Sequence, residues 1–417
     1  MPPLKGCVQM KIEDCRLLLP GRRVGAGDIE IADGRIRRID EHECPARRVV
    51  LPGLVNCHGH TPMTLVRGVG GGLPLRRWLD EAIFPIEAKM RPEDIAAGMR
   101  WGVMEMLAGG TTCVADMYDF PGEEERVLRE TGLKGRVCRV GLEFVPGRLA
   151  DCIAFVRGDG GGDVRRDFCL HSEYLTNEAF CRGLVTANRE LGRPVHVHVS
   201  ETRREHEECL GRHGKTPMRY LADLGVFDHG GYAAHCVWCT DDDFRLMAER
   251  NVTLVHNPTS NMKLGSGFAP ITRARELGVN VALGTDGCAS NDNLDMFEEM
   301  HLAALLPKGL ACDPTLLSAW DVIEMATVNG ARALGLGDSG ELREGFAADL
   351  CVVELDRPHL RPAHDIPNLV VYSMQASDVT QTIVGGRVLY DHGTFTTIDA
   401  EAAREVFDES VRHCHAK

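Results

Sequence analysis

The sequence contains no apolar run that approaches the roughly 20 residues a membrane-spanning helix requires, so no membrane partner is expected. Positive charge is also scarce. The chain has 47 Lys and Arg residues against 61 Asp and Glu residues, which gives a formal net charge of −14. Such a chain repels phosphate backbones, so we expect no nucleic-acid partner. Apolar residues make up 44% and charged residues 26% of the chain, which is typical of a soluble globular protein.

Cysteine is frequent, with sixteen residues, but a secretory segment is not expected. The stretch Met1–Cys15 carries Lys5, Lys11, Glu13 and Asp14, which leaves no apolar region of the secretory kind. In a chain this long, we therefore expect reduced thiols and a cytoplasmic protein rather than a disulfide framework. Most of the cysteines are expected to act as small buried apolar residues.

Short apolar segments alternate with longer amphipathic ones between about residues 50 and 340. Eight of them are nearly continuous apolar runs, as expected of parallel strands that are covered on both faces. These predicted strands are Val50–His58, Thr111–Asp116, Arg136–Glu143, Asp167–Glu173, Pro194–Glu201, Tyr232–Val237, Val252–Asn257 and Asn280–Asp286. The helices predicted between them include Arg91–Ala108, Glu178–Leu191, Thr216–Leu224, Asp241–Glu249 and Ile271–Leu277.

Eight strand–helix repeats predict an α/β fold, a (β/α)8 TIM barrel over residues 57–342. A doubly wound open sheet is the alternative. It is disfavoured because no Gly-rich phosphate-binding turn follows the first strand.

The two ends of the chain are β-rich and broken by glycine. We expect residues 1–56 and 343–417 to pair into one small β-sandwich domain. The predicted strands there are Cys7–Ile12, Asp28–Ala32, Arg35–Ile39, Asp349–Leu355, Leu369–Tyr372, Val379–Val384 and Arg387–Tyr390. Residues 401–416 predict a surface helix, whose last residues, His413–His415, are expected to fray.

Polar side chains gather at the predicted carboxyl ends of the strands, which face the reaction site in a barrel. Six strands ending in His or Asp are hard to explain by packing alone. The residues are His58, His60, His171, His196, His198, Glu201, His235, His256 and Asp286.

Four of these residues predict a metal site. In His58-Gly59-His60, residues two apart point to the same side, so both imidazoles can reach one ion. His196 and His198 also share a face, and we choose His198, the one nearer the mouth. With Asp286, three imidazoles and a carboxylate leave open positions on a divalent metal, as in a catalytic site. The metal lowers the pKa of its water toward about 7, and Asp286 can accept the proton.

Two further residues are candidates for proton transfer. Glu201 lies just beyond His198, where its carboxylate could pass protons to a substrate. The alternative is that Glu201 caps a helix over Thr202–Glu208. His235 could be a further ligand, a hydrogen-bond donor to the attacking hydroxide, or a core histidine. We prefer the second role because four protein ligands are already available.

Cys236 and Cys239 form a C-x-x-C pair beside His235. A metal knuckle or redox pair would use this spacing. However, no second C-x-x-C is present, and Cys236 follows His235 rather than the Pro that the zinc signature of cytidine deaminases requires. Coincidence in a cysteine-rich chain explains the pair better.

These residues lie in stretches that resemble the amidohydrolase superfamily. Within it, the sequence is most similar to the branch of adenosine, 5′-methylthioadenosine and S-adenosylhomocysteine deaminases, with the related triazine hydrolases. The resemblance covers nearly the whole chain and is carried by Leu51–Gly68, Leu73–Glu87, His198–Thr202, Ala234–Cys236, His256–Met262, Leu283–Asn291, Gly345–Val353 and Ile383–Val388.

The resemblance implies a single Zn²⁺, with Fe²⁺ as the alternative, held by His58, His60, His198 and Asp286. The fourth strand ends in His171 and offers no Lys that could be carboxylated to bridge two metals, which supports one ion.

By the same resemblance, Glu201 would protonate the ring nitrogen beside the attacked carbon, and His235 would orient the hydroxide. Asp286 would pass the proton to the departing ammonia. Glu87 would contact the ribose hydroxyls, and His171 would contact the substrate in its pocket.

Some stretches depart from the family pattern. His171-Ser172-Glu173-Tyr174 stands where the family often has His-x-Pro-Tyr, and Gly70–Gly72 replaces an acidic residue that is common before Leu-Pro. Use of S-adenosylhomocysteine would require an Arg that binds the homocysteine carboxylate. Arg148 and Arg157 are the candidates for this Arg. The 5′ substituent of the nucleoside therefore stays open.

The expected function is hydrolytic deamination of an aminated purine nucleoside or base, with a small molecule as partner. The alternatives keep the site and change the substrate: a guanine or pterin deaminase, a triazine hydrolase or a cyclic amidase. Glu201 favours an aromatic ring nitrogen that must be protonated. A barrel without catalysis is disfavoured because all four ligands and Glu201 are present. Barrel enzymes of this size often self-associate, so a homo-oligomer stays open.

Overall fold

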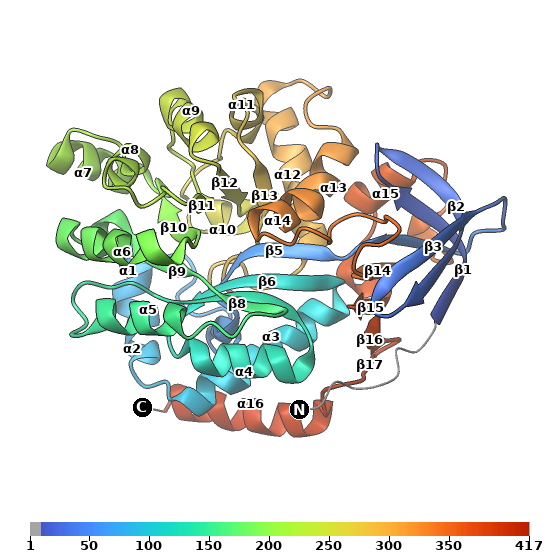
Figure 1. Ribbon diagram of the computed structural model, residues 1–417, viewed down its shortest axis with the longest axis horizontal. Coiled ribbons are helices and arrows are strands. Elements are labelled where there is room, and N and C mark those ends of the chain that lie inside the picture. The colour runs from blue at the N-terminus through green and yellow to red at the C-terminus, as the bar shows by residue number, and fades with distance from the viewer. Residues whose placement is uncertain (1–9, 417) are drawn as a thin grey trace.

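Two parallel sheets form the centre of the protein in the computed structural model, which describes residues 10–416 (Figure 1). One sheet has the strand order β13-β12-β11-β10-β9 and the other the order β5-β6-β7-β8. Their strands are β5 Leu54–Gly59, β6 Thr111–Tyr118, β7 Lys134–Arg139, β8 Val164–Arg166, β9 Phe168–Ser172, β10 Val195–Val199, β11 Gly231–His235, β12 Val252–His256 and β13 Val281–Leu283.

Seven of the eight predicted strand segments overlap one of these strands, and the first prediction is wrong in its extent. Val50–His58 is two strands that separate at Gly53. Strand β4 (Arg48–Pro52) belongs to another sheet, and β5 begins at Leu54. A Cβ on Gly53 would lie 2.2 Å from Thr112 Oγ1, so the backbone changes sheets where only glycine fits.

The edges of the two parallel sheets are joined by backbone hydrogen bonds. At one edge Gly59 and Asp286 form a parallel bridge, and Asp286 N donates to His58 O at 3.0 Å. At the other edge His171 N donates to Gly141 O at 3.1 Å. A Cβ on Gly284 would lie 2.8 Å from His58 N, which shows how closely the chain approaches β5. The ends of the first and last parallel strands therefore lie side by side.

Helices surround the two sheets (Figure 1). They are α1 Leu75–Arg77, α2 Phe84–Glu87, α3 Pro92–Ala108, α4 Pro121–Thr131, α5 Arg148–Arg157, α6 Glu178–Leu191, α7 Arg203–His213, α8 Pro217–Asp223, α9 Asp241–Glu249, α10 Pro258–Lys263, α11 Ile271–Glu276, α12 Met296–Ala311, α13 Ala319–Ala326, α14 Val328–Ala333, α15 Ile366–Tyr372 and α16 Ala400–Cys414. The short turns of helix are η1 Thr61–Val66, η2 Trp78–Ile83, η3 Glu173–Leu175, η4 Pro358–Leu360 and η5 Ala376–Asp378. Over residues 10–416, none of these helices has both the length and the apolar character needed to cross a bilayer.

Both chain ends contribute strands to a third sheet, so the predicted pairing of the two ends is confirmed, whereas a β-sandwich domain stays a prediction. Its order is β17-β16-β15-β14-β4-β1-β2-β3. The strands are β1 Met10–Leu19, β2 Arg23–Ala32, β3 Arg35–Glu41, β4 Arg48–Pro52, β14 Leu350–Glu354, β15 Val379–Val384, β16 Arg387–Asp391 and β17 Thr394–Phe395. The first residues of the predicted strand Cys7–Ile12 lie outside the described part of the chain.

One predicted strand of the C-terminal segment is a helix. Leu369–Tyr372 lies in α15, where the Asp365 side chain accepts a hydrogen bond from Asn368 N and Pro367 lies in the first turn. Both are helix-start signals, and a short apolar run does not by its periodicity distinguish a strand from a buried helix.

The C-terminal helix α16 packs against α3 rather than fraying at its end. Trp101 and Phe407 stack with ring centroids 4.7 Å apart. His413 Nδ1 lies 3.0 Å from Asp94 Oδ2, and His415 Nε2 lies 2.9 Å from Leu65 O. The prediction of a frayed tail is therefore wrong, because these side chains find partners on α3 and η1.

A buried ion pair connects the third sheet to the parallel strands. Asp349, just before β14, lies 2.7 Å from Lys134 Nζ on β7, and both side chains are less than a tenth exposed. The Asp349 carboxylate also accepts hydrogen bonds from Ser339 Oγ at 2.7 Å and Gly385 N at 2.8 Å. Burial lowers the pKa of Lys134, but the charge of Asp349 outweighs it and raises that pKa above its ordinary value.

Replacing Asp349 with Asn should lower the free energy of unfolding by about 3 kcal/mol, because it leaves the Lys134 ammonium buried without a counter-charge. The measurement is the midpoint of urea denaturation. Asp356→Asn is the matched control, since Asp356 pairs with Arg361 at 3.0 Å but is 83% exposed. That change should cost less than about 1 kcal/mol. Equal losses in the two variants would contradict this role for Asp349.

Candidate active site

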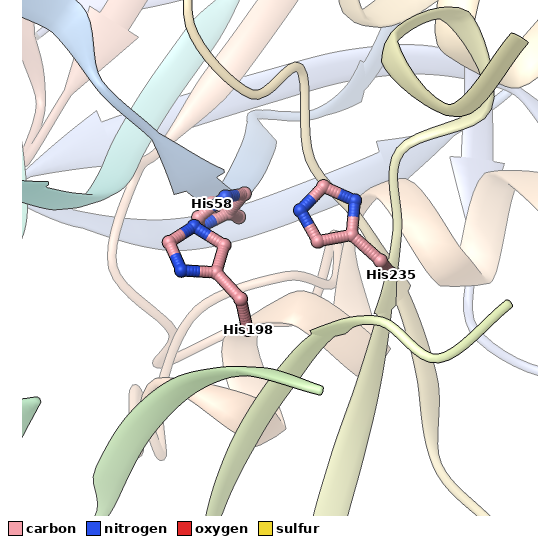
Figure 2. A group of neighbouring side chains, drawn as sticks. All are labelled: His58, His198 and His235. Carbon is pink, nitrogen blue, oxygen red and sulfur yellow. The ribbon is translucent and has the colours of Figure 1, made fainter. Parts of the chain in front are cut away.

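The predicted metal ligands meet where the ends of β5, β10 and β13 come together. His58 and His60 lie at the end of β5, His198 lies near the end of β10, and Asp286 follows β13. His58, His198 and Asp286 are buried, and the His60 side chain is 15% exposed. Figure 2 shows His58 beside His198, with His235 from the end of β11 facing them. The structure therefore brings together side chains from four strand ends.

The nitrogen and oxygen atoms at this centre are separated by a distance that suits ligands of one ion. His58 Nε2 and His60 Nε2 each lie 3.3 Å from Asp286 Oδ1, and His60 Nε2 lies 3.3 Å from His198 Nε2. Tetrahedral bonds of about 2.0–2.2 Å to zinc separate neighbouring ligand atoms by about 3.3–3.6 Å. The set also fits a metal chemically, because it consists of imidazole nitrogens and a carboxylate oxygen.

The other ring nitrogens fix how two of these imidazoles are protonated. His60 Nδ1 lies 2.6 Å from Met117 O, and His198 Nδ1 lies 2.6 Å from His171 O. A carbonyl oxygen only accepts, so each Nδ1 carries the hydrogen, and in a neutral ring Nε2 presents its lone pair. Burial lowers the pKa of His60, but the hydrogen bond to Asp286 and its charge outweigh burial and raise that pKa to about 9, so without a metal ion His60 holds a proton at Nε2. That nitrogen lies 3.3 Å from His198 Nε2, and a metal ion bound between them would take the place of the proton.

His58 and His196 form a second pair. His58 Nδ1 lies 2.8 Å from His196 Nε2, while His58 Nε2 is buried without a hydrogen-bond partner. His196 lies behind the centre, with its ring 4.3 Å from that of Tyr232. Burial lowers the pKa of His58 to about 4 and the pKa values of His196 and His198 well below their ordinary value. All three are therefore neutral near pH 7, which is the form that binds metals.

Asp286 is held as a carboxylate. Burial alone would raise its pKa, but the imidazoles of His58 and His60, whose Nε2 atoms lie 3.3 Å from Oδ1, outweigh burial and hold the pKa well below its usual range. Asp286 Oδ2 accepts a hydrogen bond from Ser260 Oγ at 2.6 Å, and Oδ1 accepts one from Gly287 N at 2.9 Å. The residue has a left-handed backbone (φ 62°), which aspartate tolerates better than most residues do.

Glu201 lies in the same cavity and does not cap the following helix. Thr202 is the N-cap of α7, and its hydroxyl accepts a hydrogen bond from Glu205 N. Glu201 Oε1 accepts instead from Ser266 Oγ at 3.2 Å, and Oε2 lies 3.8 Å from His235 Nε2. Burial raises the pKa of Glu201 above its ordinary value, because it disfavours the charged carboxylate.

Glu205 is a residue of this site that the sequence reasoning missed. Its carboxylate accepts hydrogen bonds from Ser200 N at 2.9 Å and Glu201 N at 2.7 Å, which fixes the turn that carries Glu201. Burial, with the charge of Glu201, raises its pKa to about 8. The T-x-x-E spacing from Thr202 to Glu205, which is typical of a capping box, would have revealed it.

His235 borders the cavity rather than the apolar core. Its Nδ1 lies 2.8 Å from Asn261 Oδ1, and its Nε2 lies 4.0 Å from Asp286 Oδ2. The potential ligand atoms of His58, His198 and His235 all lie within 4.8 Å of one another. His235 is thus placed either to approach an ion or to contact a water beside it. Asn261 and Ser260, whose positions the sequence reasoning missed, come from α10 in the stretch His256–Met262.

A cavity of about 1000 Å³, part of which is open to solvent, leads to this centre. Glu87 lines it and accepts a hydrogen bond from Tyr118 Oη at 2.5 Å, and burial raises the pKa of Glu87. His171 also lines it, with its ring 4.7 Å from that of His198, and burial lowers its pKa to about 3.

The remaining candidates lie apart from the centre. His256 is buried but does not border the cavity, and its Nδ1 has no hydrogen-bond partner. Cys236 and Cys239 are buried free thiols. Arg157 is on α5 with a 56% exposed side chain that lies 3.4 Å from Glu190, so it does not reach the cavity.

Comparison with known proteins places the chain among related enzymes. It is 42% identical over 364 residues to the 5-methylthioadenosine/S-adenosylhomocysteine deaminase of Acetivibrio thermocellus, covering 86% of this chain and 84% of the relative. It is 40% identical over 407 residues to the 5′-deoxyadenosine deaminase of Methanosarcina mazei, covering 94% of each. Its structure is similar to that of an adenosine deaminase from Xanthomonas campestris with bound zinc, with a TM-score of 0.89, 33% identity and coverage of 96% of this chain and 98% of that one.

A more distant likeness shows the fold alone. An atrazine chlorohydrolase from Arthrobacter aurescens, complexed with zinc, gives a TM-score of 0.88 at 22% identity, covering 96% of this chain and 99% of that one. The sequence also matches the description of the amidohydrolase family over residues 49–389. The chain therefore belongs to the amidohydrolase family.

Proposed function

We propose that this protein is a zinc-dependent hydrolase of carbon–nitrogen bonds that deaminates purine nucleosides. The observation that carries the proposal is the pair of Nε2 atoms of His60 and His198, 3.3 Å apart, each with its Nδ1 bound to a carbonyl oxygen. These two inward-facing ring nitrogens lie beside the Asp286 carboxylate, at distances that suit ligands of one metal ion. The named activities of the relatives, all aminohydrolases of adenine nucleosides, support the choice of substrate.

In this proposal His58, His60, His198 and Asp286 hold one zinc ion. A divalent ion bound there supplies Lewis acidity and lowers the pKa of water toward about 7. The buried and unpartnered Nε2 of His58 supports its place in the set, since a buried ring nitrogen without a partner is costly. Zinc rather than iron is proposed because borderline-soft imidazole ligands suit it and because it is the metal bound in the related adenosine deaminase.

The remaining residues move protons and hold the substrate. A water molecule adds to the amino-bearing ring carbon, and the carbon–nitrogen bond then breaks to release ammonia. Glu201 donates a proton to the neighbouring ring nitrogen, which the burial of its carboxyl supports. Asp286 accepts one proton of the water and passes it to the leaving amino group. The second proton of the water returns to Glu201 as the new carbonyl forms, so both carboxyl groups regain their starting forms. His235 orients the water through Nε2.

Two cavity residues are assigned to the substrate. Glu87 accepts hydrogen bonds from the ribose hydroxyls, and Tyr118 orients its carboxylate through the 2.5 Å hydrogen bond. The neutral ring of His171 contacts the substrate beside His198.

The architecture proposed for this function is a closed (β/α)8 barrel over residues 57–342. Hydrogen bonds between the edges of both parallel sheets support closure. We propose that residues 1–56 and 343–417 form a separate small β-domain, which the pairing of both chain ends in one sheet supports. The enzyme would act in the cytoplasm on a small molecule.

His198→Ala should remove the metal, whereas His196→Ala should largely keep it. The first variant loses a proposed ligand, and the second loses a residue behind His58. The measurement is metal content per chain by mass spectrometry after dialysis, with circular dichroism to confirm that both variants fold. Metal retained by His198→Ala and lost from His196→Ala would reverse the assignment of the two histidines.

Glu201→Gln should retain its zinc and lower the kcat of deamination by about 10²–10⁴-fold, because the amide cannot donate the carboxyl proton. The readouts are ammonia release and the ultraviolet shift of adenosine, 5′-methylthioadenosine and 5′-deoxyadenosine. Glu207→Gln is the matched control, since Glu207 is exposed on α7 and pairs with Arg203. It should keep wild-type turnover. Absence of turnover of every purine nucleoside by the zinc-loaded wild-type protein would overturn the proposed function.

A further inference from the structure

The cavity is rich in carboxylates and has no lysine or arginine among the described residues that line it. Its four acidic side chains are Glu87, Asp119, Glu201 and Asp286. Three of them have roles in the proposed reaction or in sugar binding. Asp119 has none, although it follows Tyr118 directly and so lies next to the side chain that contacts Glu87.

Asp119 neutralises the nearest arginine. Arg148, the first residue of α5, donates from Nη1 to Asp119 Oδ1 and from Nη2 to Asp119 Oδ2, the latter at 3.1 Å. Arg148 is 5% exposed, whereas the Asp119 side chain is 38% exposed. A bidentate guanidinium–carboxylate pair uses the two Nη donors that would otherwise bind a carboxylate of a ligand. Asp119 therefore occupies both Nη atoms of Arg148, and Arg148 is not among the residues that line the cavity.

Most of the other side chains that line the cavity are apolar. They include Trp78, Phe84, Phe120, Val140, Leu142 and Leu264. An apolar or uncharged group is stabilised against such a lining, whereas an ionised carboxylate would lose water and find no cation.

From these contacts we infer that the cavity selects purine nucleosides whose 5′ carbon bears an uncharged group, such as hydrogen or methylthio, and that Asp119 excludes 5′ substituents carrying a carboxylate. The inference rests on the proposed function and deepens it. Glu87 binds the ribose in that function, and Asp119 lies one residue beyond the tyrosine that orients Glu87. Asp119 is therefore placed to contact the 5′ substituent of the ribose.

The first test compares four substrates on the zinc-loaded wild-type enzyme. They are 5′-methylthioadenosine, S-adenosylhomocysteine, and two thioether analogues whose tail bears only an ammonium or only a carboxylate. The value of kcat/KM should be highest for 5′-methylthioadenosine and lowest for the carboxylate-only analogue, by about tenfold to a hundredfold or more. The ammonium-only analogue should lie between them, because Asp119 attracts it. Equal or better use of the carboxylate-only analogue would overturn the inference.

The second test uses Asp119→Asn, which frees the Arg148 guanidinium. The ratio of kcat/KM for the carboxylate-only analogue to that for 5′-methylthioadenosine should rise by about tenfold or more, mainly through KM. The double variant Asp119→Asn with Arg148→Met should lose this gain, because the gain depends on the guanidinium. A rise that persists without Arg148, or no rise at all in folded Asp119→Asn, would contradict the role of the pair.

Asp151→Asn is the matched control. Asp151 lies on α5 three residues after Arg148, is 54% exposed and does not border the cavity, so its loss should leave the substrate ratios unchanged. The experiments distinguish failure of the proposed deaminase function from failure of the inference about Asp119. If no nucleoside is deaminated, the proposed function is wrong. If deamination occurs but the carboxylate-bearing substrates are preferred, only the inference about Asp119 falls.

Discussion

Two short hydrogen bonds, from His60 Nδ1 to Met117 O and from His198 Nδ1 to His171 O, determine the chemistry of this centre. Each places a hydrogen of the imidazole on the outer nitrogen, so that the inner nitrogen is the one that can give an electron pair to a metal ion. Met117 O lies on β6, which pairs with β5, and His171 O lies on β9, which pairs with β10. The pairing of each strand with its neighbour therefore positions the carbonyl that binds the histidine. The fold thus orients the ligands through backbone atoms that side-chain mutation does not remove.

The meeting of the first and last parallel strands is the second condition for the site. The hydrogen bond from Asp286 N to His58 O brings the carboxylate to the imidazoles of β5, and Gly284 permits that approach because it has no side chain. Around this junction, Ser260 and Ser266 hold the two carboxylates, and Glu205 holds the backbone of Glu201. A family relationship and a site geometry that favours a cation lead to the same hydrolytic chemistry.

Much of this could be predicted from the sequence, and the exceptions have physical causes. Apolar runs with polar ends identified the parallel strands and brought His58, His60, His198 and Asp286 together, because parallel strands share one carboxyl edge. The boundary at Gly53 was missed because β4 and β5 are both apolar and only the sheet to which each belongs separates them. Leu369–Tyr372 was predicted as a strand because so short a run does not reveal its period.

The supporting contacts could not be predicted, since they join residues far apart in the chain. Ser266 and Glu201 are 65 positions apart in the sequence, and Arg148 and Asp119 are 29 positions apart. The latter contact changes the interpretation of the site most. The sequence offered Arg148 as a partner for a carboxylate on the substrate, whereas the structure pairs it with a carboxylate of its own chain.

The central claim is that one cation lies among the inward-facing nitrogens and Asp286. The most direct measurement is anomalous X-ray scattering from crystals of the zinc-loaded protein, recorded on both sides of the zinc absorption edge. The account predicts a single anomalous peak per chain within bonding distance of His58 Nε2, His60 Nε2, His198 Nε2 and an Asp286 oxygen. A map with no peak there, or with zinc bound only elsewhere, would contradict it.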